Sequence, residues 1–592
     1  MELDEYQSGM NPSVYQLPQY VSRDRRRARR AVLVEQRQRF ALVPDSLDDD
    51  LPEHARRLPP RVARLPRDMD FPAVKKSRLV LGKLLTKVNG TLVSWMSLRS
   101  RTEGGQRRMF RLIRGPRHVR SRWRNDDEFA RQRLCGVNPM HLQLCREPPA
   151  PELVTAADHW LAHREETARV ADLVRHQRLF ATNYDPLWHP SVQRHVNRKA
   201  QLAAPTCLFF ISERGALEPL AIRLRPEAAE GPNPVLTPAS PPIDWMLAKA
   251  HAQTADAHVH EGPYHLLETH LVNEAIALCM YRQLHPDHPL RQLLEDHYEG
   301  TLAINHTARN HLLSVTGPIQ KAMAAGVPGV LNAARMHYGR WNFADNSLER
   351  QLARRGVGDI PRYYYRDDAR AVHEAIFHCV SALLGLWYRR DRDVLEDVEL
   401  QAWLAETAAP DGGDVPGFPA RIATRRALIE LVTELIFRAG PQHAAVNNGQ
   451  FDSYGWIPNA PGTFYAPLCH DGHAGHDGHA DDGAPDRADD ARERISLATS
   501  EHRFWRAMPS TRQCIAQMSM VWVLSAPTER SLLHLGESSA FSAAQCFSAH
   551  RAVVAFRRRL QSISSAIHRR NERLDVPYWY LDPLNISRST DI

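Results

Sequence analysis

The sequence predicts a mainly α-helical fold that contains one small β element. Apolar residues recur at helical spacing from Ser77 to Leu98 and again from Leu428 to Phe437. Two β-branched and aromatic runs, 208–211 and 220–224, flank the turn-forming residues 213–215, which is typical of a β-hairpin. We therefore expect a small sheet in a mostly helical chain.

Local signals place further helices along the chain. Residues 25–40 form a helix-capable run, and Asp244 is predicted to be the N-cap of a helix that leads into a histidine-containing segment. Near the end of the chain, residues 518–524 and 549–570 are predicted to be helical. Residues 577–583 begin and end with proline, so we expect the last segment to turn inward.

The composition suggests an N-terminal arm and one large domain. Residues 1–70 are rich in Arg, Pro, Gln and Asp, which predicts a basic, Pro-rich arm or collar. Residues 71–592 contain enough apolar material for a large core. Within them, a tract at about 469–490 is rich in His, Asp and Gly and is of low complexity. Such tracts can chelate metal, but we favour a solvated loop here.

The charge of the chain excludes few partners by itself. The net charge is +8, and its excess sits in arginine clusters at 23–30 and 107–124. Such clusters usually form a solvated face, although an anionic membrane surface or nucleic acid also fits them. No zinc-finger spacing and no aromatic platform accompany the arginines, so we expect no nucleic-acid partner. Peripheral contact with a membrane stays open.

Cysteine usage and the absence of targeting signals predict a soluble, cytoplasmic protein. The eight cysteines are scattered and form no CxxC pair, as expected for free thiols in a reducing compartment. The first residues show no basic segment followed by an apolar run, and no stretch of about 20 apolar residues occurs. We also expect a monomer.

Two pairs of side chains point to a metal site. His265 and His270 stand five residues apart, which in a regular α-helix leaves their rings about 140° apart. A local π-bulge would bring them to one side, and such bulges are frequent at functional sites. His443 and Asn447 are four residues apart and share a helix face. Singly, each histidine is more often a packed core residue, but three neutral imidazoles suit iron, zinc or copper.

Several short sequence motifs occur in the same order as in one known protein family. They are Trp123-x2-Asp126-x2-Phe129-x2-Gln132-x3-Gly136-x-Asn138-Pro139, His288-Pro289-Leu290, Gly417-Phe418-Pro419 and Pro577-Tyr578-Trp579-Tyr580-Leu581-Asp582-Pro583. Together with the histidine pattern and the final Ile592, they resemble the lipoxygenases from about residue 123 to the end. The first 122 residues hold little β-patterned sequence, so the chain is similar to compact bacterial members without an N-terminal β-sandwich lipid-binding domain.

The resemblance implies a single lipoxygenase-like catalytic domain over 71–592 with a non-haem iron centre, and it makes the tract at about 469–490 an insertion relative to the family. The iron ligands would be His265, His270, His443, Asn447 and the terminal carboxylate of Ile592, a set that manganese could also occupy. No catalytic residue is expected beyond a hydroxide held by the metal. The reaction would remove a bis-allylic hydrogen from a polyunsaturated fatty acid such as linoleate or arachidonate and add O2. A hydroperoxide isomerase or lyase of the same fold and a non-catalytic lipid-binding scaffold are the alternatives.

The same resemblance implies which residues line the channel for substrate and O2. They are Leu266, Leu271, Ile304 and Leu312 near the metal, with Ala257, Ala322 and Met323 toward the floor. Ala308 stands where this family tends to carry Ala for S products and Gly for R products, so an S-hydroperoxide is expected. Glu261 departs from the family's usual Gln and would lie behind the metal ligands, where a carboxylate can change ligand basicity.

Overall fold

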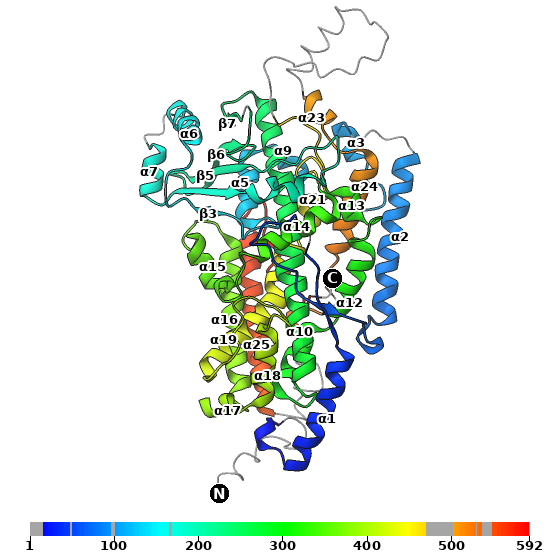
Figure 1. Cartoon of the computed structure of the whole chain (residues 1–592). Coiled ribbons are helices and arrows are strands. Elements are labelled where there is room, and N and C mark those ends of the chain that lie inside the picture. The colour runs from blue at the N-terminus through cyan, green and yellow to red at the C-terminus, as the bar shows by residue number, and fades with distance from the viewer. Residues whose placement is uncertain are drawn as a thin grey trace, which may run out of the picture.

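The computed structural model describes residues 16–47, 50–95, 101–164, 168–231, 233–468, 501–528, 530–534, 547–590 and 592. The predicted insertion at 469–490 lies outside these residues. Helices dominate the described chain, which confirms the mainly α prediction (Figure 1). The six cysteines among the described residues are free thiols. No described helix combines the length and the apolar composition that crossing a bilayer requires.

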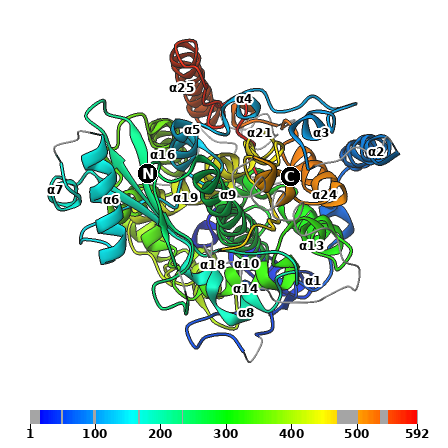
Figure 2. The ribbon, with the colours of Figure 1, turned by 90° about the horizontal axis from the view of Figure 1, so that it is seen from above.

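Long helices form the body of the molecule. They are α1 (Arg23–Arg39), α9 (Pro242–Val259), α10 (Val272–Gln283), α14 (Gly326–Tyr338), α16 (Tyr364–Leu384), α18 (Val398–Ala408), α19 (Arg425–Phe437), α24 (Thr511–Leu524) and α25 (Phe547–Asn571). α16 packs against α19 and α25, and α10 packs against α1 and α18. The separate α2 (Ala73–Trp95) runs along one edge of the molecule in both ribbon views (Figures 1 and 2).

Shorter helices connect these elements. They are α3 (Glu103–Arg107), α4 (Val119–Arg122), α5 (Asp126–Cys135), α6 (Pro151–His163), α7 (Val170–Arg175), α8 (Pro190–Gln193), α11 (Pro289–Tyr298), α12 (Thr301–Thr307), α13 (Pro318–Ala322), α15 (Leu348–Arg355), α17 (Asp391–Leu395), α20 (His443–Asn447), α21 (Gln450–Tyr454) and α23 (His502–Arg506). Within the described ranges, three π-helical segments interrupt or join them: η4 (His260–Leu271), η5 (Ala308–Leu312) and η7 (Arg438–Gln442).

The β structure is small, as predicted. Five antiparallel strands have the order β3 (Gln143–Leu144), β4 (Leu179–Asn183), β5 (Thr206–Ile211), β6 (Leu217–Arg223) and β7 (Val235–Leu236). β5 and β6 are the predicted hairpin, and Gly215 provides the positive φ of 68° that its turn requires. A further pair, β1 (Leu42–Val43) and β2 (Arg61–Val62), lies near the N-terminus. α6 and α7 cover one face of the larger sheet.

One predicted helix cap is wrong. α9 begins at Pro242 with Pro241 at the N-cap position, and Asp244 lies inside the first turn instead. Proline is favoured at the first helical position because its missing N–H has no intrahelical partner there. Asp244 still stabilises the helix start, since a negative charge in the first turn complements the helix dipole.

The centre of the molecule is one continuous helical rod from Pro242 to Gln283, formed by α9, η4 and α10. Most of its residues are buried on every side. A helix with buried residues all round belongs to the interior of a large domain, and here the rod carries polar side chains inside that interior. This placement holds His265 and His270 far from bulk water.

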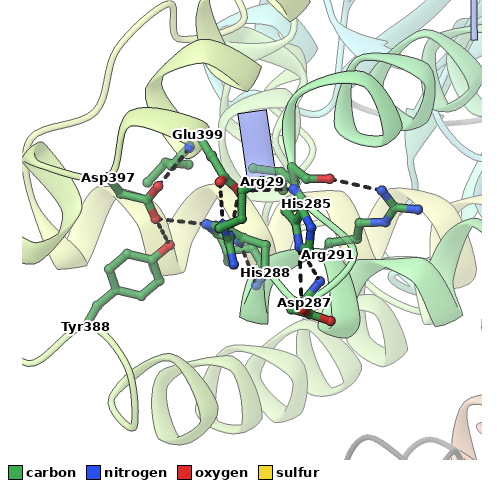
Figure 3. A network of polar contacts seen from close by, with 11 residues as sticks. Arg29, His285, Asp287, His288, Arg291, Tyr388, Asp397 and Glu399 are labelled. Atoms are coloured by element: carbon green, nitrogen blue, oxygen red, sulfur yellow. Dashed lines mark hydrogen bonds and ion pairs between the residues drawn. The ribbon is translucent and has the colours of Figure 1, made fainter. Parts of the chain in front are cut away.

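The N-terminal helix α1 is fixed to the body by a buried ion pair. The Arg29 guanidinium donates to both carboxylate oxygens of Glu399 at 2.7 and 2.8 Å, and both side chains are buried (Figure 3). Beside this pair, the imidazole of His288 and the hydroxyl of Tyr388 meet the buried carboxylate of Asp397. The bidentate geometry satisfies both charges, which buried ion pairs require.

Replacing Arg29 by Leu is expected to destabilise the fold by about 3–5 kcal/mol, because the Glu399 carboxylate stays buried without its cation. The measurement is the free energy of unfolding from urea titrations. Arg392→Leu is the matched control, since its pair with Glu396 lies on the surface and should change stability by less than about 0.5 kcal/mol. Equal effects of the two substitutions would contradict a role for burial.

Candidate metal centre and substrate cavity

The π-helical segment η4 brings His265 and His270 to one side of the rod. Their Nε2 atoms lie 3.2 Å apart, as the five-residue spacing requires of a widened helix. Pro263 lies inside the segment and lacks the N–H that a regular turn would use, which favours the wider turn. Gly262 allows close packing, since a Cβ there would stand 2.9 Å from the carbonyl oxygen of Val330.

A second π-helical segment delivers His443. η7 contains Pro441, and α20 begins directly after it at His443. The ligand atoms of His265, His270 and His443 all lie within 4.8 Å of one another. The Nε2 atom of His443 is buried and has no hydrogen-bond partner among the described residues. A buried nitrogen left without a partner beside two others is the arrangement that a bound cation satisfies.

All three imidazoles are held in the neutral form that binds metals. Burial lowers the pKa of His265 to about 4 and that of His270 to about 3. Burial, followed by the neighbouring His270 and His265, keeps the pKa of His443 well below its usual value. Each ring therefore offers a lone pair at neutral pH.

Asn305 on α12 fixes the orientation of the His270 ring. The Oδ1 atom of Asn305 lies 2.9 Å from Nδ1 of His270, while its Nδ2 donates to the backbone oxygen of His270 and to Glu274. Because that amide oxygen can only accept, His270 carries its proton on Nδ1 and presents the Nε2 lone pair to the cluster. The ion pair of Glu274 with Arg309 extends this network outward.

Asn447 lies one turn after His443 on α20 and is fully buried. Its Nδ2 donates to the carbonyl oxygen of Leu524 at 2.8 Å, and its Oδ1 accepts from Gln450 at 2.9 Å. An amide oxygen has two acceptor sites, so one remains for a weak metal bond. The two hydrogen bonds therefore fix the orientation of the amide, with Nδ2 toward Leu524 and Oδ1 toward Gln450.

The last residues of the chain run into the same site. Thr590 is buried; its hydroxyl accepts from Asn273 Nδ2 at 3.0 Å and donates to the carbonyl oxygen of Ala439 at 3.0 Å. Gly440 makes room for this passage, because a Cβ there would meet the carbonyl oxygen of Ser587 at 2.7 Å. Ile592 lines the cavity together with His265 and His270.

Glu261 lies beside His265 and lines the cavity with it. One carboxylate oxygen is 3.5 Å from Nδ1 of His265, and the other is 3.9 Å from Nδ1 of His260. Burial raises the pKa of Glu261, although His260 opposes this shift. The carboxyl group can therefore accept a proton more readily than an exposed glutamate, and its protonation state acts directly on a histidine of the cluster.

An apolar cavity of about 700 Å³ is lined by His265 and His270 of the cluster, whereas His443 does not line it. Four of the eight residues expected to line a channel do line it: Leu266, Ile304, Ala308 and Leu312. The other four, Leu271, Ala257, Ala322 and Met323, do not line it and are buried. Ala257 and Met323 pack in a cluster with Ile319, Val330 and Met520, which do form part of the wall. They lie one layer behind the surface that a ligand would touch.

Sequence reasoning missed two walls of the cavity. One is α2, which contributes Leu79, Lys83, Thr86, Lys87, Gly90, Thr91 and Ser94, and the other is α24 with Arg512, Ile515, Ser519, Met520, Val523 and Leu524. Both segments were predicted to be helical, but nothing in their own residues shows what they face. The spacing of their apolar residues predicts that one face of each helix is buried, but it does not predict which element or cavity that face contacts.

Acidification is expected to destabilise the metal-free protein strongly below about pH 6.5. Burial lowers the pKa of four histidines outside the cluster, His141, His251, His258 and His297, to about 4 in the folded state. Between these values and the unfolded pKa of about 6.5, the unfolded chain binds more protons, so each histidine costs up to about 1.4 kcal/mol per pH unit as pH falls. Urea midpoints that stay constant from about pH 7 to 5 would contradict this.

Comparison with known proteins places the whole arrangement in one family. A family model described as Lipoxygenase matches residues 87–577. The chain is 34% identical over 511 residues to the polyunsaturated fatty acid lipoxygenase ALOX8 of Mus musculus, covering 84% of this chain and 69% of that protein. It is 32% identical over 480 residues to the hydroperoxide isomerase ALOXE3 of Homo sapiens, covering 80% and 63%.

A solved structure agrees at the level of the fold. The anaerobic crystal structure of delta413-417:GS LOX in complex with arachidonate matches with a TM-score of 0.84 and 27% identity, covering 98% of this chain and 84% of that one. Upstream of residue 87, the described residues form α1, most of α2 and two short strands, with no β-sandwich among them. The extent of the family match and the histidine geometry lead to one conclusion: the chain belongs to the lipoxygenase family.

Proposed function

We propose that the protein is an iron-dependent dioxygenase that converts a polyunsaturated fatty acid, such as linoleate or arachidonate, into an S-hydroperoxide. The observation that carries the proposal is a cluster of three buried, neutral imidazoles, of which His265 and His270 line an apolar cavity large enough for a C18 or C20 acid. The similarity to a polyunsaturated fatty acid lipoxygenase supports the substrate class.

The donor set fits iron. His265, His270 and His443 would hold it, with the Oδ1 atom of Asn447 and the terminal carboxylate of Ile592 completing the ligands. Three neutral nitrogens, one amide oxygen and a single anion suit a first-row metal that changes oxidation state. Bound iron would supply the one-electron chemistry that removes a hydrogen atom from the weak bis-allylic C–H bond. Manganese fits the same donors, and elemental analysis separates the two.

The residues of the chain orient the substrate and exclude water. Lys83, Lys87 and Arg512 are exposed side chains that line the cavity, which suits a carboxylate held at the mouth with the hydrocarbon inside. The rest of the wall is mostly apolar, apart from Glu261 beside His265 and a few hydroxyl side chains, so the reacting carbons meet few competing hydrogen-bond donors. Dioxygen adds to the carbon radical left by hydrogen removal, and return of a hydrogen atom completes the hydroperoxide. One fatty acid and one O2 give one product without another co-substrate.

The direct test measures dioxygen uptake and conjugated-diene absorbance with linoleate and arachidonate, on protein whose iron content has been determined. We expect one hydroperoxide per O2 consumed, and chiral separation of the products is expected to give the S enantiomer. Iron-loaded protein that consumes no O2 with either acid would overturn the proposal. A predominantly R product would overturn only its stereochemical part.

A hydroperoxide isomerase is the second candidate, because the similarity to ALOXE3 is almost as high as that to ALOX8. The two functions differ in what they consume. An isomerase would remove added fatty-acid hydroperoxide without O2 uptake, whereas a dioxygenase accumulates it. Parallel assays with fatty acid and with its hydroperoxide decide between them.

A further inference from the structure

Helix α2 carries an apolar stripe on its solvent side. Its exposed large hydrophobic residues are Val74, Val80, Leu81, Leu84, Val88, Leu92 and Trp95, of which Leu81 is 65% and Trp95 82% exposed. Residues 81, 84, 88, 92 and 95 follow one another at spacings of three and four, so they form one continuous face. Contiguous exposed apolar surface of this kind marks an interaction site.

The fold itself does not use this stripe. α2 is held by its other side, where Thr86, Asn89, Gly90 and Val93 are buried. Gly90 lies so close to α24 that an added Cβ would stand 2.6 Å from the Ile515 side chain. Asn89 also binds the backbone of residues 109–112. The helix is therefore anchored from within, while both ribbon views place it at the edge of the molecule (Figures 1 and 2).

The basic charge of α2 indicates which kind of partner its apolar stripe would contact. The helix contains no acidic residue and five basic ones: Lys75, Lys76, Arg78, Lys83 and Lys87. A second copy of the chain seated on the same face would bring like charges together, which costs energy at an interface. An anionic lipid surface meets both needs, because its headgroups attract the lysines and its acyl region accepts the apolar stripe.

The stripe also lies next to the mouth of the cavity. Lys83, Lys87, Thr91 and Ser94 are exposed on α2 and line the cavity. Leu313 and Pro318 also line the cavity, and Val315, which lies between them in the sequence, does not line it and is 87% exposed. A bilayer that touched α2 and Val315 would lie against the mouth, so an acyl chain could pass from lipid to cavity without crossing water.

We propose that α2 is a membrane-docking helix that seats the protein on an anionic bilayer surface, with its cavity mouth facing the lipid. The idea that the fatty acid enters the cavity from the bilayer rests on the proposed dioxygenase function. The docking itself does not depend on turnover. The helix is expected to lie in the plane of the membrane–water interface. Lysines flank its apolar stripe, and its opposite side carries polar residues, so it does not insert further.

The test measures binding to vesicles of phosphatidylcholine with and without phosphatidylglycerol, by flotation and by quenching of tryptophan fluorescence with brominated lipids. Wild-type protein is expected to float with the anionic vesicles and to be released by salt. L81S/L84S removes two stripe residues and keeps Trp95 as reporter; its partition should fall at least about tenfold, since each leucine loses its apolar burial. Thermal melting checks that the variants fold.

The matched control is L395S/V398S, which removes two exposed apolar residues on α17 and α18, away from α2 in Figure 1. Its vesicle binding should equal that of wild type. Equal binding by L81S/L84S, or no preference of wild type for anionic lipid, would overturn docking by α2. So would a wild-type dimer that L81S/L84S converts to monomer. Absent O2 uptake with normal vesicle binding would overturn the proposed function and leave the docking intact.

Discussion

A short extension after Ile592, such as Gly-Ser, is expected to reduce both iron retention and O2 uptake by at least about a hundredfold. The reason is geometric. Hydrogen bonds fix Thr590 to Asn273 on α10 and to Ala439 in η7. If added residues move Ile592, this fixed segment leaves it little freedom to regain its position beside the histidines. A peptide carbonyl would then stand where the carboxylate is proposed to bind, and the metal would lose its anionic ligand. Iron per chain is measured by elemental analysis, and uptake with an oxygen electrode.

The matched control for the extension is Ile592→Val, which shortens the side chain and keeps the terminal carboxylate in place. This variant should retain its iron and most of its activity. Gly440→Ala offers an independent approach, because its new methyl group meets the carbonyl oxygen of Ser587 and pushes the terminal segment away from η7. A fully active, iron-loaded extended protein would remove the carboxylate from the ligand set.

The helical class, the hairpin and the π-helical widening could be predicted because each depends on residues close in sequence. Five-residue spacing within one helix leaves two rings apart unless the helix widens, and η4 is the observed solution. A local sequence signal marks both widened segments. The pattern Gly-Pro-x-His occurs at Gly262–His265 and again at Gly440–His443, and both copies lie in π-helical segments or at their ends.

The rest of the site depends on contacts between distant segments. Asn305 orients His270 from a separate helix 35 residues away, and its role has no local signature. Glu268 is similar: it lies between the two histidines of η4 and meets His337 and Gln442, the residue before His443. Ala257 and Met323 were expected to line the cavity but pack behind its wall. The sequence position of a residue indicates which side of a helix it occupies, but it does not indicate whether another side chain separates it from the cavity.

Replacing Ala308 by Gly is expected to move the product from S toward R at a neighbouring carbon. Ala308 begins the π-helical segment η5 and lines the cavity, so its methyl group fills space beside the reacting chain. Removing that methyl opens room for dioxygen at the other end of the pentadienyl radical. One methyl in an apolar pocket is worth about 1–3 kcal/mol, or roughly 10- to 200-fold in a ratio of rates. Chiral chromatography of the hydroperoxides measures that ratio.

The matched control for Ala308→Gly is Ala303→Gly on the preceding helix, α12. Ala303 is buried, packs against Phe71 and Ile304, and does not line the cavity. Both substitutions add backbone freedom and cost about 1 kcal/mol of helix stability, so a change caused by loosening alone should appear in both proteins. Only Ala308→Gly should change the enantiomer ratio. An unchanged chiral profile in that variant, with iron and stability retained, would show that this methyl group does not direct dioxygen.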